Sequence, residues 1–194
     1  MIFFCLMRQK LFKKPYIHPH ATVIGNVTFG DGCSIWPGAV LRGDMAPIKL
    51  GDAVNIQDNA TLHCDSRHDI LIGNYNVIAH NVMLHGCRIG NGCLIGIGSI
   101  ILDKAEIGDG AMITAGCLIR GGMKIPAQSM VIQKDGKLRI VENKGKPVYA
   151  VASCLEYMEL AKRARKNIFM PFTQEEELAM FEVARKITEE MRIS

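Results

Sequence analysis

Three histidines in the first half of the chain have the chemistry of metal ligands. His80 and His85 stand five residues apart in the stretch IAHNVMLHGC, and His63 precedes them. Imidazole nitrogens are common zinc ligands, and three of them with an open fourth position are typical of catalytic zinc. A separation of five suits neither one face of a helix nor one face of a strand. The histidines can share an ion only if another kind of backbone brings them together.

A six-residue repeat provides that backbone. Large apolar residues recur at every sixth position over most of the chain, and a small side chain usually follows four residues later. A period of six does not fit a helix, but it fits a short strand followed by a tight turn. An all-β sandwich is the alternative, and the strict period disfavours it. The repeat positions are Ile17, Val23, Phe29, Ile35, Leu41, Leu50, Ile56, Leu62, Ile72, Ile78, Leu84, Ile89, Ile95, Ile101, Ile107, Ile113, Ile119, Ile125 and Val131.

Three repeat units close one triangular coil, and successive coils stack about 4.8 Å apart, as parallel strands do. We therefore predict a mainly β fold, a parallel β-helix of about six triangular coils, over residues 15–132. Residues 133–149 are expected to form a loop or hairpin that turns at Asp135 and Gly136. Residues 150–194 have helical periodicity, and we expect their α-helices to pack on the β-helix.

The second of these C-terminal helices is expected to begin at a capping box. The sequence TQEE starts at Thr173, so the threonine and the glutamate three residues later can each satisfy a free backbone N–H group. One face of this helix is then expected to carry Leu178, Phe181, Ile187 and Met191.

The coil register places two of the histidines together. Leu62 and Leu84 are three units apart, so they occupy the same face of adjacent coils. His63 and His85 each follow one of these core residues and therefore point outward from that face. Arg42 heads the same outward column one coil earlier. We predict that His63 and His85 reach one metal ion, whereas His18, His20 and His68 lack this register and are read as surface or loop residues.

His80 lies on a different face, because it follows the core residue Ile78 by two positions. Gln57 and Asp58 precede it by one coil on that face. A three-fold assembly that joins the first face of each chain to the second face of the next would bring His80 of a neighbouring chain to His63 and His85. We therefore expect a homotrimer with metal sites at its subunit interfaces.

Composition excludes several classes of function. The net charge is +4, and no basic run is interleaved with aromatic residues, so we expect no nucleic-acid partner. No apolar run approaches 18 residues, so we expect no membrane span. The seven cysteines suit a reducing cytoplasm, and Cys33, Cys93 and Cys117 stand at small corner positions where packed thiols are inert. Residues 2–7 are expected to be a tail.

At the level of motifs the sequence resembles the gamma-class carbonic anhydrases and their bacterial and archaeal homologues, in the hexapeptide-repeat superfamily of left-handed β-helices. The stretches that carry the resemblance are WPGAVLRGD, VNIQDNATLH, AHNVMLHGCRIG and NGCLIGIGSII, all within residues 36–101. The resemblance implies a left-handed β-helix and the reversible hydration of CO₂ to bicarbonate by a zinc-bound hydroxide at a trimer interface.

The resemblance also implies roles for particular residues. The zinc ligands would be His63, His80 and His85, and Fe²⁺ or Co²⁺ would also suit three histidines. Six further residues would complete the site. Arg42, Asp44 and Asp58 would form an ion-pair network at the subunit interface, Gln57 would hydrogen-bond the metal-bound water or the substrate, Asn55 would support that site, and Tyr157 would approach the metal from the C-terminal helix.

The chain departs from the family pattern at two places. Met45 stands where well-characterised members carry a glutamate, and the loop 64–70 is short. Asp65, His68 and Asp69 are its only candidate proton shuttles. These departures leave two alternatives open: a catalytically weak or inactive metal-binding homologue or scaffold, and a hexapeptide acyltransferase that uses acyl-CoA.

Overall fold

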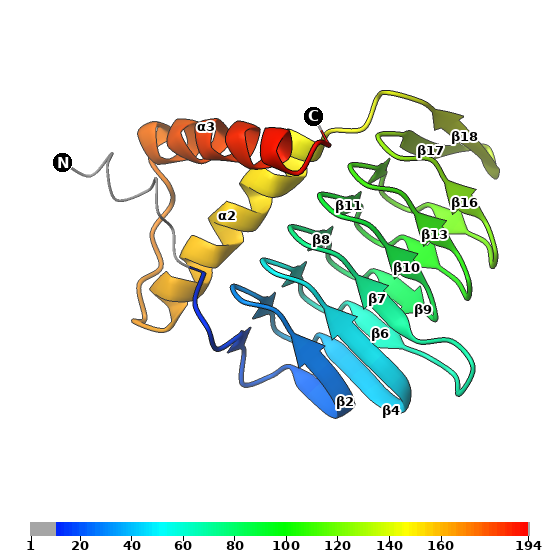
Figure 1. The fold of residues 1–194 in the computed structure, drawn as a ribbon. Coiled ribbons are helices and arrows are strands. Elements are labelled where there is room, and N and C mark those ends of the chain that lie inside the picture. Colours follow the sequence, from blue (N-terminus) through cyan, green and yellow to red (C-terminus); the bar gives the residue numbers. More distant parts are fainter. Residues whose placement is uncertain (1–10, 194) are drawn as a thin grey trace.

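The computed structural model describes residues 11–193. It is a left-handed parallel β-helix of about six turns with two helices against one side (Figure 1). The predicted fold class is therefore confirmed. The tail expected at residues 2–7 lies outside the described residues. Within residues 11–193, neither helix combines the length and the apolar character that a membrane span needs.

Two sheets make the three faces of the β-helix. One face is an eight-stranded sheet in the order β1-β3-β5-β8-β11-β14-β17-β18. The other two faces belong to a ten-stranded sheet, and they meet in the long strand β4, whose first half pairs with β6 and whose second half pairs with β7. The strands of the first face are β1 (Tyr16–Ile17), β3 (Ser34–Ile35), β5 (Asn55–Ile56), β8 (Val77–Ile78), β11 (Leu94–Ile95), β14 (Met112–Ile113), β17 (Met130–Lys134) and β18 (Lys137–Val141). Those of the second sheet are β2 (Thr22–Phe29), β4 (Val40–Leu50), β6 (Thr61–His63), β7 (Ile70–Ile72), β9 (Met83–His85), β10 (Arg88–Ile89), β12 (Ile100–Ile101), β13 (Glu106–Ile107), β15 (Leu118–Ile119) and β16 (Lys124–Ile125).

The six-residue repeat positions form the core of the solenoid. Every predicted position from Ile35 to Val131 is at most 5% exposed. Val23 and Phe29 are partly buried against this core. The prediction is wrong for Ile17, which is 41% exposed, because β1 is the edge strand of its sheet and lacks a coil below it.

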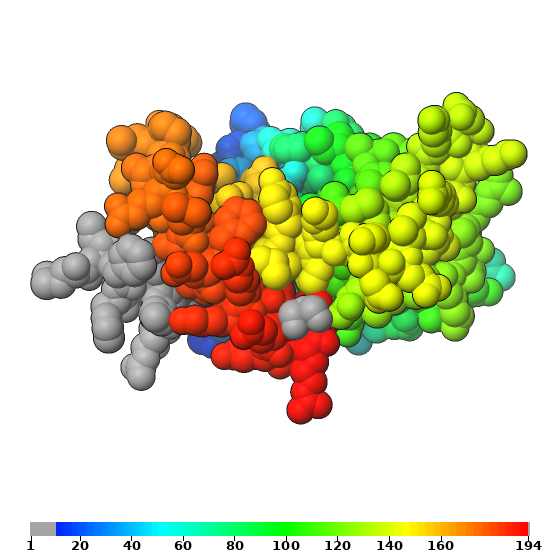
Figure 2. Space-filling view, turned by 90° about the horizontal axis from the view of Figure 1, so that it is seen from above, coloured from blue at the N-terminus to red at the C-terminus, as the bar shows by residue number. Residues whose placement is uncertain are grey.

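The C-terminal helices cover one side of the solenoid (Figure 2). Helix α2 (Pro147–Ala164) contacts β3, β5 and β8, and α3 (Gln174–Glu190) packs on α2. Helix α2 begins inside the segment 133–149, after the hairpin of β17 and β18 that turns at Asp135 and Gly136. Tyr157 is thereby carried by the helix that touches the coils.

The predicted capping box is present at the start of α3. Thr173 accepts a hydrogen bond from the backbone N–H of Glu176, whose side chain accepts one from the backbone N–H of Thr173. The predicted apolar face needs one correction. Leu178 is 60% exposed, whereas the smaller Ala184 is fully buried against α2 together with Met180. Small side chains let the two helices approach closely, which a reading based on large apolar residues misses.

Candidate functional site

His63 and His85 lie side by side on adjacent parallel strands, as the coil register predicted. They are register partners on β6 and β9, and their ring centroids are 5.3 Å apart. Arg42 is the register partner of His63 on β4. Each of these residues follows a fully buried core leucine, which forces its own side chain outward. We call Arg42, Asp44, His63 and His85 patch one.

Patch one is held by charged hydrogen bonds. Arg42 Nη1 donates to Asp44 Oδ2 at 2.6 Å, and the other carboxylate oxygen of Asp44 lies 3.1 Å from His63 Nε2. The hydrogen bond from Arg42 is the main reason that the pKa of Asp44 is lowered from its ordinary value. Asp44 is therefore a hydrogen-bond acceptor placed between a guanidinium and an imidazole.

The far side of His85 is also occupied by a carboxylate. His85 Nδ1 lies 2.6 Å from Asp103 Oδ1, across the turn that follows β12. This contact leaves Nε2 of His85 for another partner. The sequence contained a signal for it, because Asp103 comes directly after Leu102, the next residue of the outward column that contains His85.

The second set of predicted residues gathers on the neighbouring face, and we call Asn55, Gln57, Asp58, His80 and Tyr157 patch two. His80 Nδ1 lies 3.2 Å from Asp58 Oδ2, so within one chain Asp58 pairs with His80. The ring of Tyr157 packs against Trp36 with centroids 5.4 Å apart. Burial, and then the charge of Asp58, raise the pKa of Tyr157.

Two amides complete patch two. Asn55 is 1% exposed, and its Nδ2 donates to Ser34 Oγ at 2.9 Å. Its Oδ1 is buried with no hydrogen-bond partner in the described structure. Gln57 is 5% exposed one residue beyond the buried Ile56. An unpartnered buried oxygen is costly, so Asn55 is suited to accept one further hydrogen bond.

The three predicted ligands do not meet within one chain. Within residues 11–193, one group of three histidine, cysteine or acidic side chains has its ligand atoms within 4.8 Å of one another. It consists of Asp65, His68 and Asp103. Patch one supplies two imidazoles and patch two supplies one. A donor set of three imidazoles suits Zn²⁺. Asp58 lies at Nδ1 of His80 and Asp103 lies at Nδ1 of His85. Carboxylates in this position are the usual partners of metal-binding histidines.

The sequence predicts that His68 is a surface or loop residue, and the structure gives it charged neighbours. It is half-buried in the loop 64–70, where its Nδ1 lies 3.1 Å from Asp65 Oδ1. The six-residue register stops at this loop, so the sequence offered no signal that His68 approaches Asp103.

The cysteines are packed in the interior, as predicted for Cys33, Cys93 and Cys117. The six described cysteines are all free and buried. Burial raises the pKa of Cys33 and of Cys93 to about 12, so neither thiol is ionised near neutral pH. Cys64, next to His63, is fully buried, and its Sγ donates to the carbonyl of Ala46.

Comparison with known proteins gives three further findings. Residues 86–121 match the family described as bacterial transferase hexapeptide (six repeats). The chain is 45% identical over 69 residues to a protein named "Probable carbonic anhydrase" from Methanocaldococcus jannaschii, an alignment of 36% of this chain and 43% of the relative. It is 41% identical over 83 residues to gamma carbonic anhydrase 1, mitochondrial, of Arabidopsis thaliana, covering 40% and 30% of the two chains. The chain thus spans less than half the length of these curated relatives.

A solved structure is matched over a larger share. The hexapeptide transferase family protein of Anaplasma phagocytophilum has a TM-score of 0.65 and 33% identity to this chain, covering 76% of this chain and 91% of the relative. Identity at that level over nearly the whole relative reflects common descent as well as a shared fold. The chain therefore belongs to the hexapeptide transferase family, and it is related in sequence to the gamma-class carbonic anhydrases.

Proposed function

We propose that the chain forms a homotrimer that binds Zn²⁺ at each subunit interface and catalyses the reversible hydration of CO₂ to bicarbonate. The observation that carries the proposal is the division of the histidines between two faces. His63 and His85 are adjacent on one face, and His80 lies on the next. One face of one chain supplies His63 and His85. In a three-fold arrangement, a neighbouring chain would supply His80 as the third imidazole.

The residues of the two patches have distinct tasks in this proposal. His63 and His85 of one chain, with His80 of its neighbour, hold the metal. A bound Zn²⁺ would supply a Lewis acid that lowers the pKa of its water to about 7, far below that of free water. The donor set would also accept Fe²⁺ or Co²⁺. Asp44 accepts hydrogen bonds and stays ionised because Arg42 lowers its pKa.

The amides and the tyrosine of patch two would position the substrate. Gln57 would hydrogen-bond the substrate, and Asn55 would support it through its unpartnered oxygen. Tyr157 would close the site from helix α2, where it already lies within the electrostatic influence of Asp58. Arg42, Asp44 and Asp58 would pair across the subunit interface. A reducing cytoplasm is the compartment we propose, since all described cysteines are free thiols.

Complementation between two inactive variants tests the shared site. His63→Ala destroys patch one and leaves patch two intact, and His80→Ala does the reverse. When the two are unfolded, mixed in equal amounts and refolded, about one quarter of the sites in random trimers should regain three histidines. Zinc content and CO₂ hydration, measured by stopped flow, should recover in proportion. The mixture of His63→Ala with His85→Ala is the control, since both variants lack patch one and no site in their trimers can hold three histidines. No recovery from a mixture that sediments as a trimer would contradict the shared site.

A second candidate function is acyl transfer from acyl-CoA, which the family of the Anaplasma relative suggests. The observation that favours it is a cavity of about 780 Å³ beside Asp58, far larger than CO₂ requires. Lys14 and Arg165 line it together with the aromatic rings of Tyr16 and Trp36. Calorimetric titration with acetyl-CoA separates the two candidates, because the carbonic anhydrase proposal expects no saturable binding and the transferase proposal requires it.

A further inference from the structure

Asp103 contacts His85, one of the predicted metal ligands. Its Oδ1 lies 2.6 Å from His85 Nδ1, a short distance for a hydrogen bond between an imidazole and a carboxylate. Within the described part of the chain, the ion pair found for Asp103 is this one with His85. The Asp103 side chain is 40% exposed, yet it lies against the imidazole of His85. In the described part of the chain it forms no ion pair with the neighbouring Lys104. Asp103 is therefore more than a solvated surface charge.

The contact determines which nitrogen of His85 is available. A neutral imidazole carries one proton, and a carboxylate at Nδ1 holds the proton there. The lone pair is then on Nε2, which is the form that can bind a metal ion. The negative charge behind the ring also makes Nε2 a better donor, and loss of such a partner typically weakens metal affinity 10–100-fold.

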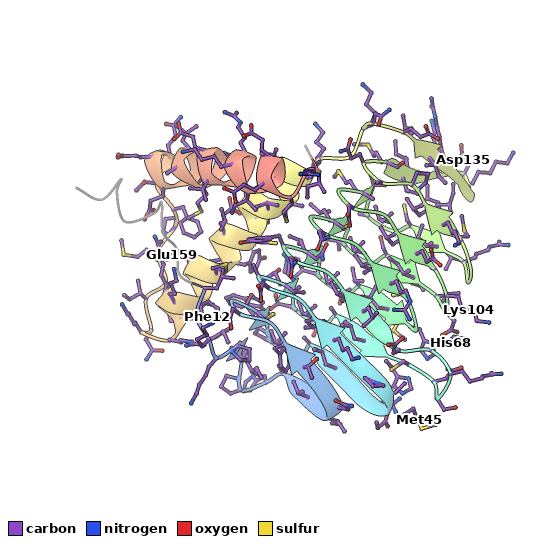
Figure 3. The ribbon with its side chains drawn as sticks, viewed as in Figure 1. Phe12, Met45, His68, Lys104, Asp135 and Glu159 are labelled. Atoms are coloured by element: carbon purple, nitrogen blue, oxygen red, sulfur yellow. The ribbon has the colours of Figure 1, made fainter. Side chains whose placement is uncertain are left out.

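The loop 64–70 comes up against Asp103 from the other side. Asp65 Oδ1 accepts hydrogen bonds from the backbone N–H groups of Arg67 and His68, and His68 Nδ1 lies 3.1 Å from the same oxygen. Ligand atoms of Asp65, His68 and Asp103 all lie within 4.8 Å of one another. Figure 3 shows His68 on the same edge of the solenoid as Lys104, the residue after Asp103.

Gly86 makes the approach feasible. A Cβ atom at this position would lie 2.3 Å from Asp103 Oδ1 and 2.8 Å from the Cβ of His68. The backbone there also has a positive φ of 50°, which favours glycine. Gly86, which follows His85, thus leaves free the space into which Asp103 and His68 both extend.

We propose that Asp103 is a positioning residue that orients His85 for metal binding, and that His68, which Asp65 holds in the loop 64–70, assists Asp103 from beside it. The proposal rests on the function proposed above for the identity of the ligand, but the contact itself exists in the metal-free chain. The short loop 64–70 thereby has a task next to the site.

The tautomer of His85 tests the proposal without any metal. Long-range ¹H–¹⁵N spectra of the metal-free protein at pH 8 distinguish the protonated ring nitrogen from the unprotonated one, and His85→Gln assigns the signals. The wild type should show His85 protonated at Nδ1. Asp103→Ala should shift the ring toward protonation at Nε2, and Asp103→Asn, which keeps an acceptor, should retain more of the Nδ1 form. An unchanged ring in Asp103→Ala would overturn the proposal.

Zinc affinity provides the second measurement. In competition with a chromophoric chelator, Asp103→Ala should bind Zn²⁺ 10–100-fold more weakly than wild type, and His68→Ala should fall between them. Asp69→Asn is the matched control, since it removes a carboxylate from the same loop that pairs with Arg88 and not with His85. Equal affinities for Asp103→Ala and Asp69→Asn would overturn the proposal. A wild type that binds no zinc would instead refute the proposed function, and the tautomer measurement would still decide the role of Asp103.

Discussion

Tyr157 and Trp36 pack edge to face, with ring centroids 5.4 Å apart and planes at 80°. Tyr157 belongs to helix α2, and Trp36 follows β3, so this contact ties the helical segment to the coil face that carries patch two. Trp36 is the single tryptophan of the chain. Its fluorescence therefore reports directly on whether α2 is docked beside Asp58 and His80.

The first prediction distinguishes the role of the Tyr157 hydroxyl from the role of its ring. Tyr157→Phe should keep the edge-to-face contact, change stability by less than about 1 kcal/mol, and leave Trp36 emission unchanged. CO₂ hydration should nevertheless fall, since the hydroxyl is the group proposed to face the site. Tyr157→Ala should lower stability by about 1–3 kcal/mol and shift Trp36 emission to the red, because a partly buried aromatic ring that packs on Trp36 is lost. Full activity in Tyr157→Phe would remove Tyr157 from the site and leave only its packing role.

The second prediction concerns Leu84, which supports the histidine pair from inside. It is fully buried, and its register partners are Leu62 and Ile101. Leu84→Ala should cost about 2–5 kcal/mol in urea unfolding, because it leaves a cavity between stacked coils. Zinc affinity should drop as well, since His85 is the next residue.

Leu84→Met serves as the control for this experiment. It conserves volume, so it should cost less than about 1.5 kcal/mol and keep the zinc affinity. If Leu84→Ala lost stability and kept full zinc affinity, the coil core would not be what positions His85.

The strict repeat explains how much of the site could be predicted. A six-residue period fixes which residues share a face and which coil lies above which, so the pairing of His63 with His85 follows from counting. Counting fails where the period is broken. The loop 64–70 inserts residues between units, and the contact of His68 with Asp65 depends on its local turn. The cavity at Asp58 depends on where α2 ends, which no repeat determines.

The third prediction tests the start of helix α3. Thr173→Ala removes the hydroxyl that accepts a hydrogen bond from the backbone N–H of Glu176, and it should lower the free energy of unfolding by about 1 kcal/mol. Thr173→Ser keeps that acceptor and should cost only a few tenths of a kcal/mol. Thermal unfolding followed by circular dichroism gives both values. Zinc binding should stay at the wild-type level in each variant, because α3 packs on α2 and carries none of the three histidines. Equal losses in the two variants would show that the cap contributes nothing measurable.

The fourth prediction is a loss of stability at alkaline pH. Burial raises the pKa of Cys33, Cys87 and Cys93 from 9.0 to about 12. Below pH 9 these thiols are protonated in both the folded and the unfolded chain. Between pH 9 and 12 they ionise only when the chain unfolds, so ionisation favours the unfolded state by up to about 1.4 kcal/mol per pH unit for each thiol.

Urea unfolding at pH 8, 9, 10 and 11 measures this slope. The double variant Cys33→Ala and Cys93→Ala is the control, since alanine already fills the same small corner position at Ala39 and Ala111. Its stability should decline less steeply above pH 9 than that of the wild type. Parallel slopes would mean that other groups, such as the partly buried tyrosines whose pKa values are also raised, account for the alkaline loss. Because burial is the main cause of these raised pKa values, the difference in slope measures how many of the substituted thiols stay protonated in the folded chain.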